Sequence, residues 1–229
     1  GNNGHDRIDG GAGVDTLRAS ADGAVMGIAA LAGVEAIDGA GHAGVTISLT
    51  ETADTLDLSA LTVTGIAGIV GGAGDDVIRG SNGADTFLVG ISDGSDDIDG
   101  GAGIDTIKAT ADGVTIGLKH LASVEAITAD GHVGVTVRTT DAADTLDLSS
   151  MTLTGIERIT LGAGDDVFVG TGGSDTIEGG AGNDTLTGGY GDDTYLFSLG
   201  DGHDTIREGL SGAGGGLDVL RFGRGIRPE

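Results

Sequence analysis

The sequence predicts an all-β chain that winds as a β-solenoid with 18-residue coils. A nine-residue unit, G-G-x-G-x-D-x-U-x with U a large apolar residue, recurs along the 229 residues. Its clearest copies are 10–18, 71–79, 100–108 and 179–187. In addition, residues 19–70 align without gaps with 109–160 at a constant shift of 90, which is five times 18. Such periods are typical of a solenoid, in which each repeat stacks on its neighbours.

Each nonapeptide divides into a turn and a short strand. Glycine at positions 1, 2 and 4 permits backbone conformations that other residues avoid. The x-U-x tail is a strand with one inward side chain, so two units make a flattened coil with a parallel sheet on each side. The predicted core is the set of U residues: Ile8, Leu17, Ile78, Phe87, Ile98, Ile107, Phe168, Ile177, Leu186, Tyr195, Ile206 and Leu220.

The 90-residue shift predicts an organisation in units within one continuous solenoid. We expect a first unit at 1–90, a second at 91–198 with two extra nonapeptides, and at 199–229 the start of a third unit or a terminal segment. Apolar residues three apart within 19–70 and 109–160 are compatible with short helices, but glycines there oppose a helix. We therefore favour solenoid coils that lack the glycine-rich turn.

Composition excludes several classes of protein. There are 48 Gly but one Pro and no Cys, which rules out collagen and a disulfide scaffold. The net charge of −25 is the wrong sign for a nucleic-acid binder, and no apolar run is long enough for a membrane span. Disorder is disfavoured because 38% of the residues are hydrophobic.

The aspartate at position 6 of each unit points to calcium. Stacked coils place these carboxylates about 4.8 Å apart, where they repel unless a cation lies between them. Calcium takes six to eight oxygens, whereas transition metals prefer Cys or His, and the five His are scattered. The predicted ligands are Asp6, Asp15, Asp76, Asp85, Asp96, Asp105, Asp166, Asp175, Asp184, Asp193, Asp204 and Asp218, with the backbone carbonyls of Gly162, Gly164, Gly180, Gly182, Gly189 and Gly191.

Some copies depart from the pattern. At 49–57 and 139–147 only the Asp and Leu positions survive, so we expect weak or no calcium binding at Asp54 and Asp144. Asp6 and Asp15 face degenerate coils, and we expect partial sites there. Because calcium bound only by the folded chain adds to stability, we expect an expanded coil without calcium and a rigid roll with it.

Other candidate sites are weak. His42 and His132 are equivalent through the shift of 90 and are interpreted as turn residues that pack or cap locally. Three glutamates at one heptad position (Glu35, Glu125 and Glu157) are interpreted as a solvated outer face rather than as acid/base groups. The basic residues Lys108, Lys119, Arg138 and Arg158 are too dispersed for a lyase groove. We predict no enzyme activity in this chain.

The repeats resemble those of the RTX, or haemolysin-type calcium-binding, family over 1–18, 71–108 and 161–221. The run 191–197 followed by 200–206 resembles the family's terminal repeat. The resemblance implies a right-handed parallel β-roll loaded with several calcium ions. It also implies export by a type I secretion system and folding outside the cell, in the extracellular medium or at the bacterial cell surface.

Two parent contexts stay open. We expect a piece of a longer repeat protein, and the long 90-residue repeats favour a surface adhesin in which this module is a monomeric, calcium-stiffened spacer. The alternative is the C-terminal module of a secreted enzyme, such as a protease, lipase or alginate-modifying enzyme. A carbohydrate-binding role toward surface or matrix polysaccharide also remains open.

Overall fold

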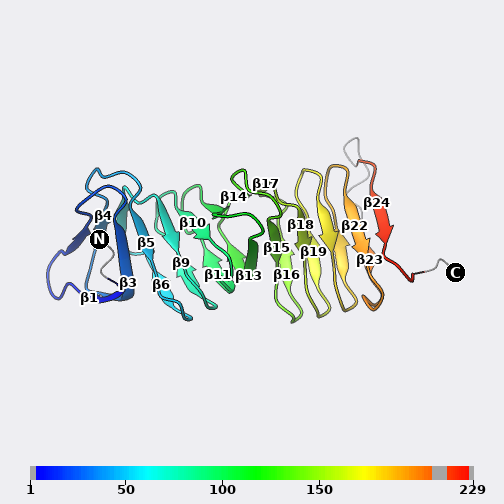
Figure 1. The fold of residues 1–229 in the computed structure, drawn as a ribbon, viewed down its shortest axis with the longest axis horizontal. Coiled ribbons are helices and arrows are strands. Elements are labelled where there is room, and N and C mark those ends of the chain that lie inside the picture. The colour runs from blue at the N-terminus through cyan, green and yellow to red at the C-terminus, as the bar shows by residue number, and fades with distance from the viewer. Residues whose placement is uncertain (1–3, 208–215, 227–229) are drawn as a thin grey trace.

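The strands of the chain stack side by side as coils along one long axis (Figure 1). The computed structural model describes residues 4–207 and 216–226. In this part of the chain every regular element is a strand, and all pairings between strands are parallel. The predicted all-β solenoid is therefore confirmed, and so is the preference for coils over helices in 19–70 and 109–160.

Two long sheets run along the solenoid. The eight-stranded sheet contains, in order, β1 (Asp6–Asp9), β3 (Val25–Ala32), β5 (Thr46–Ser48), β8 (Gly68–Val70), β10 (Thr86–Val89), β12 (Thr106–Ala109), β14 (Ala126–Thr128) and β17 (Thr152–Thr154). The nine-stranded sheet contains β6 (Thr55–Asp57), β9 (Val77–Arg79), β11 (Ser95–Asp99), β13 (Thr115–Ala122), β15 (Thr136–Arg138), β18 (Arg158–Thr160), β20 (Thr176–Glu178), β22 (Thr194–Phe197) and β24 (Val219–Phe222).

Two shorter sheets complete the coils. One contains β2 (Thr16–Arg18), β4 (Ala36–Asp38) and β7 (Thr62–Thr64). The other contains β16 (Thr145–Asp147), β19 (Val167–Val169), β21 (Thr185–Thr187) and β23 (Thr205–Ile206).

The degenerate tracts are places where one sheet ends and another begins. In the first tract β7 ends the three-stranded sheet while β6 begins the nine-stranded one. In the second tract β17 ends the eight-stranded sheet while β16 begins the four-stranded one. Strands that correspond at the shift of 90, such as β5 and β15, consequently lie in different long sheets.

The 18-residue coil holds only where the turns are compact. Ile159, Ile177 and Tyr195 follow one another in register at 18-residue intervals. Elsewhere the interval is longer: Ile107 pairs with Phe87, 20 residues earlier, and Val63 pairs with Ile37, 26 residues earlier. The expectation of a uniform 18-residue coil is therefore wrong outside the compact stretches, because looser turns add residues without changing the strand pairing.

The core is larger than the predicted set of U residues. Most of that set is buried, and Ile8, Leu17 and Ile206 are partly buried. Leu220 was wrongly assigned to the core, since it is 50% exposed in the last strand of its sheet in the described part. The degenerate tracts contribute further buried side chains, including Leu58 and Leu148 directly after β6 and β16. These turns close over the core with leucines where the regular turns have glycines.

Candidate metal sites

Successive position-6 aspartates lie one above another and are joined by hydrogen bonds. The backbone N–H of Asp144 donates to Oδ1 of Asp166 at 2.7 Å. In the same way Asp166 donates to Asp184 at 2.9 Å, and Asp184 donates to Asp204 at 3.0 Å. Each carboxylate therefore accepts from the preceding coil, and the series forms what we call a carboxylate ladder.

The part of the chain that the structure describes contains five such ladders. They are Asp15–Glu35, Asp54–Asp76–Asp96, Asp85–Asp105–Glu125, Asp144–Asp166–Asp184–Asp204 and Asp175–Asp193–Asp218.

Of the predicted aspartates, only Asp6 lies outside a ladder. It is exposed in β1, and its register partner in the next coil is Ile28 rather than a carboxylate. Glu35 and Glu125 are exposed, as expected for a solvated face, but the sequence did not place them in the ladders, where their carboxylates accept the N–H groups of Asp15 and Asp105 at 2.8 and 2.7 Å. Each of these glutamates follows its aspartate by 20 residues, two more than the predicted 18-residue coil, so the predicted spacing could not place them opposite each other.

Most turns within the ladders are glycine turns, which we define by positive φ at positions 2 and 4. Gly162 and Gly164 have φ of 100° and 115°, and Gly180 and Gly182 have φ of 94° and 152°. Close packing imposes a second requirement, since a Cβ on Gly180 would lie 1.9 Å from the carbonyl oxygen of Gly162. Glycine therefore satisfies both the backbone conformation and the close approach of the preceding coil's carbonyls.

The glycine turns leave one carboxylate oxygen buried and without a partner. Oδ2 has no hydrogen-bond partner in the described structure at Asp15, Asp76, Asp105, Asp166 and Asp184. Asp105 is fully buried, and Asp76, Asp166 and Asp184 are each 1% exposed. An unpaired buried carboxylate oxygen is costly, so this donor set fits a hard cation such as calcium, which takes carboxylate and carbonyl oxygens.

Burial also changes the acidity of these groups. Loss of solvent raises the pKa of Asp76 and of Asp166 to about 6, and neighbouring carboxylates add to the effect. The pKa of Asp96 is raised to about 7 for the same reasons. Burial likewise raises the pKa of Asp105 and Asp184. The charged form of each ladder is thus unfavourable without a counter-ion.

Carbonyl oxygens would have to supply most of the remaining ligands. No group of three or more His, Cys, Asp or Glu side chains converges on one point within 4–207 and 216–226. Among the predicted carbonyls, that of Gly162 accepts the N–H of Ala181 at 3.0 Å and that of Gly191 accepts the N–H of Gly216 at 3.1 Å. A carbonyl oxygen has two lone pairs, so these bonds leave one available for a cation.

The two predicted turn histidines pack locally. Nδ1 of His42 lies 3.1 Å from Oδ1 of Asp22, and Nδ1 of His132 lies 3.2 Å from Oδ1 of Asp112. Each aspartate also accepts a backbone N–H of the histidine's turn, which lowers the pKa of both aspartates. His42 and His132 are therefore turn residues with local contacts, as interpreted, and the backbone N–H groups are capped by Asp22 and Asp112.

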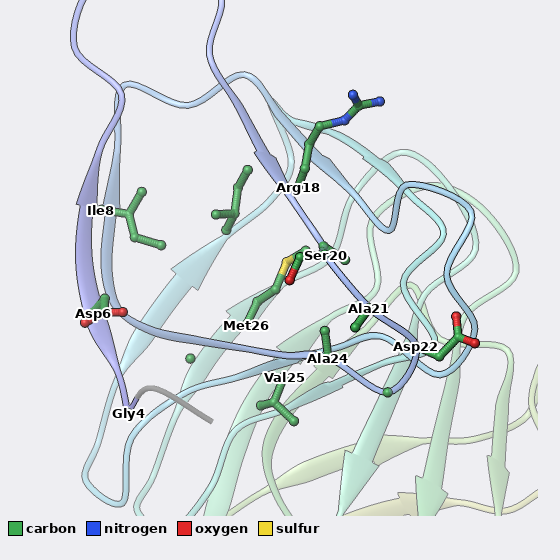
Figure 2. Close-up of a pocket in the computed structure, with 14 residues that line it drawn as sticks. Gly4, Asp6, Ile8, Arg18, Ser20, Ala21, Asp22, Ala24, Val25 and Met26 are labelled. Atoms are coloured by element: carbon green, nitrogen blue, oxygen red, sulfur yellow. The ribbon is translucent and has the colours of Figure 1, made fainter. Parts of the chain in front are cut away.

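A hollow of about 330 Å³ lies at the N-terminal end of the solenoid, between β1 and the segment that leads into β3. Its ionisable lining groups are Asp6, Arg18 and Asp22. Figure 2 shows Asp6 and Asp22 on opposite sides of it. Arg18 is paired with Asp38 at 2.8 Å. The lining therefore does not bring an acid and a base together.

No helix in the described residues could cross a membrane.

Comparison with known families agrees with the geometry of the ladders. The model of the RTX calcium-binding nonapeptide repeat, which spans four copies, matches residues 1–22, 69–91, 92–112, 152–185, 160–195 and 169–206. No curated protein matches the chain. The family matches cover more than half of the sequence and include the glycine turns described above. The chain belongs to the RTX calcium-binding nonapeptide repeat family.

Proposed function

We propose that calcium ions bind at the glycine turns of the ladders and that this binding folds and stiffens the roll. The observation that carries the proposal is the buried, unpartnered Oδ2 of Asp15, Asp76, Asp105, Asp166 and Asp184. Turn carbonyls, including those of Gly162, Gly164, Gly180 and Gly182, complete the shell. Asp193 and its neighbours Gly189 and Gly191 form an equivalent turn.

The mechanism is charge neutralisation between stacked turns. Each ladder places like charges in successive coils, and burial raises the cost of ionising them. A divalent ion beside the orphaned oxygens removes both costs and ties two turns together. Calcium is favoured over magnesium because it tolerates irregular shells of six to eight oxygens, whereas magnesium demands a strict octahedron and keeps its waters.

The same mechanism favours function outside the cell. At about 1 mM free calcium and a Kd of about 10 μM, each site adds about 2.7 kcal/mol of stability. Where free calcium is far below Kd the contribution vanishes. We therefore propose a module that crosses the envelope unfolded through a type I secretion system and then folds at the cell surface or beyond it. There it acts as a monomeric, calcium-stiffened spacer of an adhesin, near surface polysaccharide.

A second candidate is the C-terminal RTX module of a secreted enzyme. We assign no catalytic residue within the described chain, and in this context the catalytic groups belong to another domain. The calcium chemistry is the same in both contexts. Repeated 90-residue units in flanking sequence would support the adhesin, and a catalytic motif there would support the enzyme.

The test is a calcium titration of metal-free protein. Circular dichroism should show a cooperative gain of β signal with calcium, and calorimetry should show several ions per chain. Magnesium at the same concentration serves as the matched control and should not restore the signal. Equal β content in excess chelator would contradict calcium-driven folding, and the absence of calcium binding would contradict the assignment of the sites.

A further inference from the structure

Four of the ladders begin with a turn that differs from the glycine turns. Its position 2 is Thr50, Ser81, Thr140 or Thr171, and both the N–H and the hydroxyl donate to Oδ2 of the aspartate in the same turn. In one such turn Ser81 donates to Asp85 at 2.7 Å from N and 2.9 Å from Oγ. In another Thr171 donates to Asp175 at 2.8 and 3.0 Å. We call these hydroxyl turns.

The backbone of the hydroxyl turns also differs. Gly72 and Gly74, in the glycine turn of Asp76, have φ of 91° and 117°. Gly83 and Gly173 occupy position 4 of two hydroxyl turns, and neither has positive φ. Since glycine adopts both conformations readily, the hydrogen bonds of the turn, rather than residue type at position 4, select its shape.

Hydroxyl turns occupy one defined place in the fold. The aspartates of these turns, Asp54, Asp85, Asp144 and Asp175, are each the first member of their ladder in the described structure. Each donates its N–H forward to the next carboxylate, and no ladder carboxylate precedes it. The first turn therefore has no glycine turn below it to share a cation, and its own hydroxyl and N–H satisfy the oxygen that later turns leave orphaned.

We infer that the hydroxyl at position 2 is a cation-independent cap at the start of these four ladders, in the way that a Ser or Thr side chain caps a helix. This inference rests on the proposed calcium function. Asp54, Asp85, Asp144 and Asp175 take no calcium ion of their own. Calcium binds at the glycine turns that follow, and the first turn keeps its shape whether calcium is present or not. Asp85 and Asp175, which the repeat pattern predicts as ligands, are thereby reassigned to caps.

Ser92 shows that a hydroxyl residue at position 2 is not sufficient to form a hydroxyl turn. It precedes Asp96, the last carboxylate of its ladder, and it is exposed with φ of 69°. Within the described residues its hydroxyl makes no hydrogen bond to Asp96. Ser81 and Ser92 are thus the same residue type at the same repeat position. Ser81 lies in the first turn of a ladder and Ser92 in the last turn of another. The pair provides a matched control.

The decisive experiment counts bound calcium ions in the full chain by calorimetry and equilibrium dialysis. Asp184→Asn should lose one ion per chain, and Asp175→Asn should keep the full number. Loss of an ion from Asp175→Asn would overturn the inference. If Asp175→Asn does not fold, Thr171→Val, which removes only the hydroxyl, is counted instead and should also keep every ion. If the wild type binds no calcium, the proposed function fails rather than the cap.

Hydrogen exchange provides the second readout. Ser81→Ala should speed amide exchange at residues 81–85 to the same extent with and without calcium, because the bonds it removes do not involve the ion. Ser92→Ala should leave exchange in its turn unchanged. An effect of Ser81→Ala that calcium abolishes would show that the ion, rather than the hydroxyl, holds that turn, and the cap would be wrong.

Discussion

The backbone N–H of Asp166 donates to Oδ1 of Asp184 across 2.9 Å, although the two residues are 18 positions apart. From the second member of each ladder onward, one carboxylate oxygen is thereby used to align one coil with the next. Oδ2 of Asp166 and of Asp184 remains buried without a partner. One carboxylate thus aligns the coils through Oδ1 and, in the proposed function, offers Oδ2 to a cation. Substitution by Asn keeps an oxygen for alignment and removes the charge.

Asp184→Asn should therefore reduce the free energy of unfolding in the presence of calcium but not in its absence. With calcium the variant should lose about 2.7 kcal/mol, the contribution of one site at a hundredfold excess over Kd. Without calcium it should be no less stable than the wild type, since it removes a buried charge that faces like charges. Urea unfolding with calcium and with chelator measures both.

Asp147→Asn is the matched control for that pair of measurements. Asp147 is exposed in β16, outside any ladder, and accepts hydrogen bonds only from Ser149 in the described structure. Its substitution should change stability similarly in both calcium states. Equal losses for Asp184→Asn in the two states would contradict its role as a calcium ligand.

The calcium-free roll should become more stable as the pH falls from about 7 to about 4. The pKa of Asp96 is raised to about 7 and those of Asp76 and Asp166 to about 6, from 3.8. The folded chain therefore binds more protons than the unfolded chain in this window, so folding is favoured as protons are added. The stabilisation is complete once the pH is below 3.8, the pKa of these groups in the unfolded chain. It is lost as the pH rises through their pKa values in the folded chain, which are about 6 for Asp76 and Asp166 and about 7 for Asp96.

The measurement is the urea midpoint in chelator at several pH values. Calcium-loaded protein should show the reverse trend, because protons compete with calcium for the same oxygens. A midpoint in chelator that is constant or that rises with pH would contradict the assignment of these carboxyl groups as buried and unpaired.

Gly180→Ala should be much more damaging than Gly131→Ala. Both glycines have φ near +90°, at 94° and 89°. A Cβ on Gly180 would lie 1.9 Å from the carbonyl oxygen of Gly162, whereas a Cβ on Gly131 would meet nothing within 4 Å. Gly131→Ala should cost about 1–2 kcal/mol from the left-handed conformation alone. Gly180→Ala should cost about 1–3 kcal/mol more because the coils must separate.

Thermal unfolding in saturating calcium measures the difference between the two glycine variants. Calorimetric ion counts should also fall for Gly180→Ala, since its carbonyl shell is displaced. Equal losses of stability would mean that conformation, and not coil packing, requires glycine at position 2.

Leu186→Ala and Leu220→Ala should separate the true core from its exposed end. Both leucines occupy the U position, but Leu186 is fully buried and Leu220 is 50% exposed. Leu186→Ala should cost about 2–5 kcal/mol by creating a cavity, and Leu220→Ala should cost about 1 kcal/mol or less, as for other exposed sites. Chemical denaturation in calcium compares the two. A similar cost at both positions would show that β24 is covered in solution.

The regular part of the fold was predictable because local spacing alone specifies it. In the run from Asp166 to Tyr195, each nonapeptide contains its own turn glycines and one inward side chain, so coil length and pairing follow directly. Asp184 and Asp193 were placed correctly on the same grounds. The coils around β5 to β8 were not predictable in this way, because their turns lack the paired glycines of the nonapeptide and no short motif encodes their length or their number of strands.

The sequence by itself determined the parallel solenoid, the stacked aspartates and the membership of a calcium-binding repeat family, because these depend on residues repeated at nearly constant intervals. Only the tertiary structure decided which oxygens are free. Asp85 and Asp184 occupy the same position of the same motif. Oδ2 of Asp85 is satisfied by Ser81, whereas Oδ2 of Asp184 is orphaned. Position 2 is Ser81 in the first turn and Gly180 in the second, but a hydroxyl residue alone does not decide the outcome. Ser92 holds the same position before Asp96 with φ of 69°, and within the described residues it makes no such bond, so the fold of the turn determines whether the oxygen is satisfied.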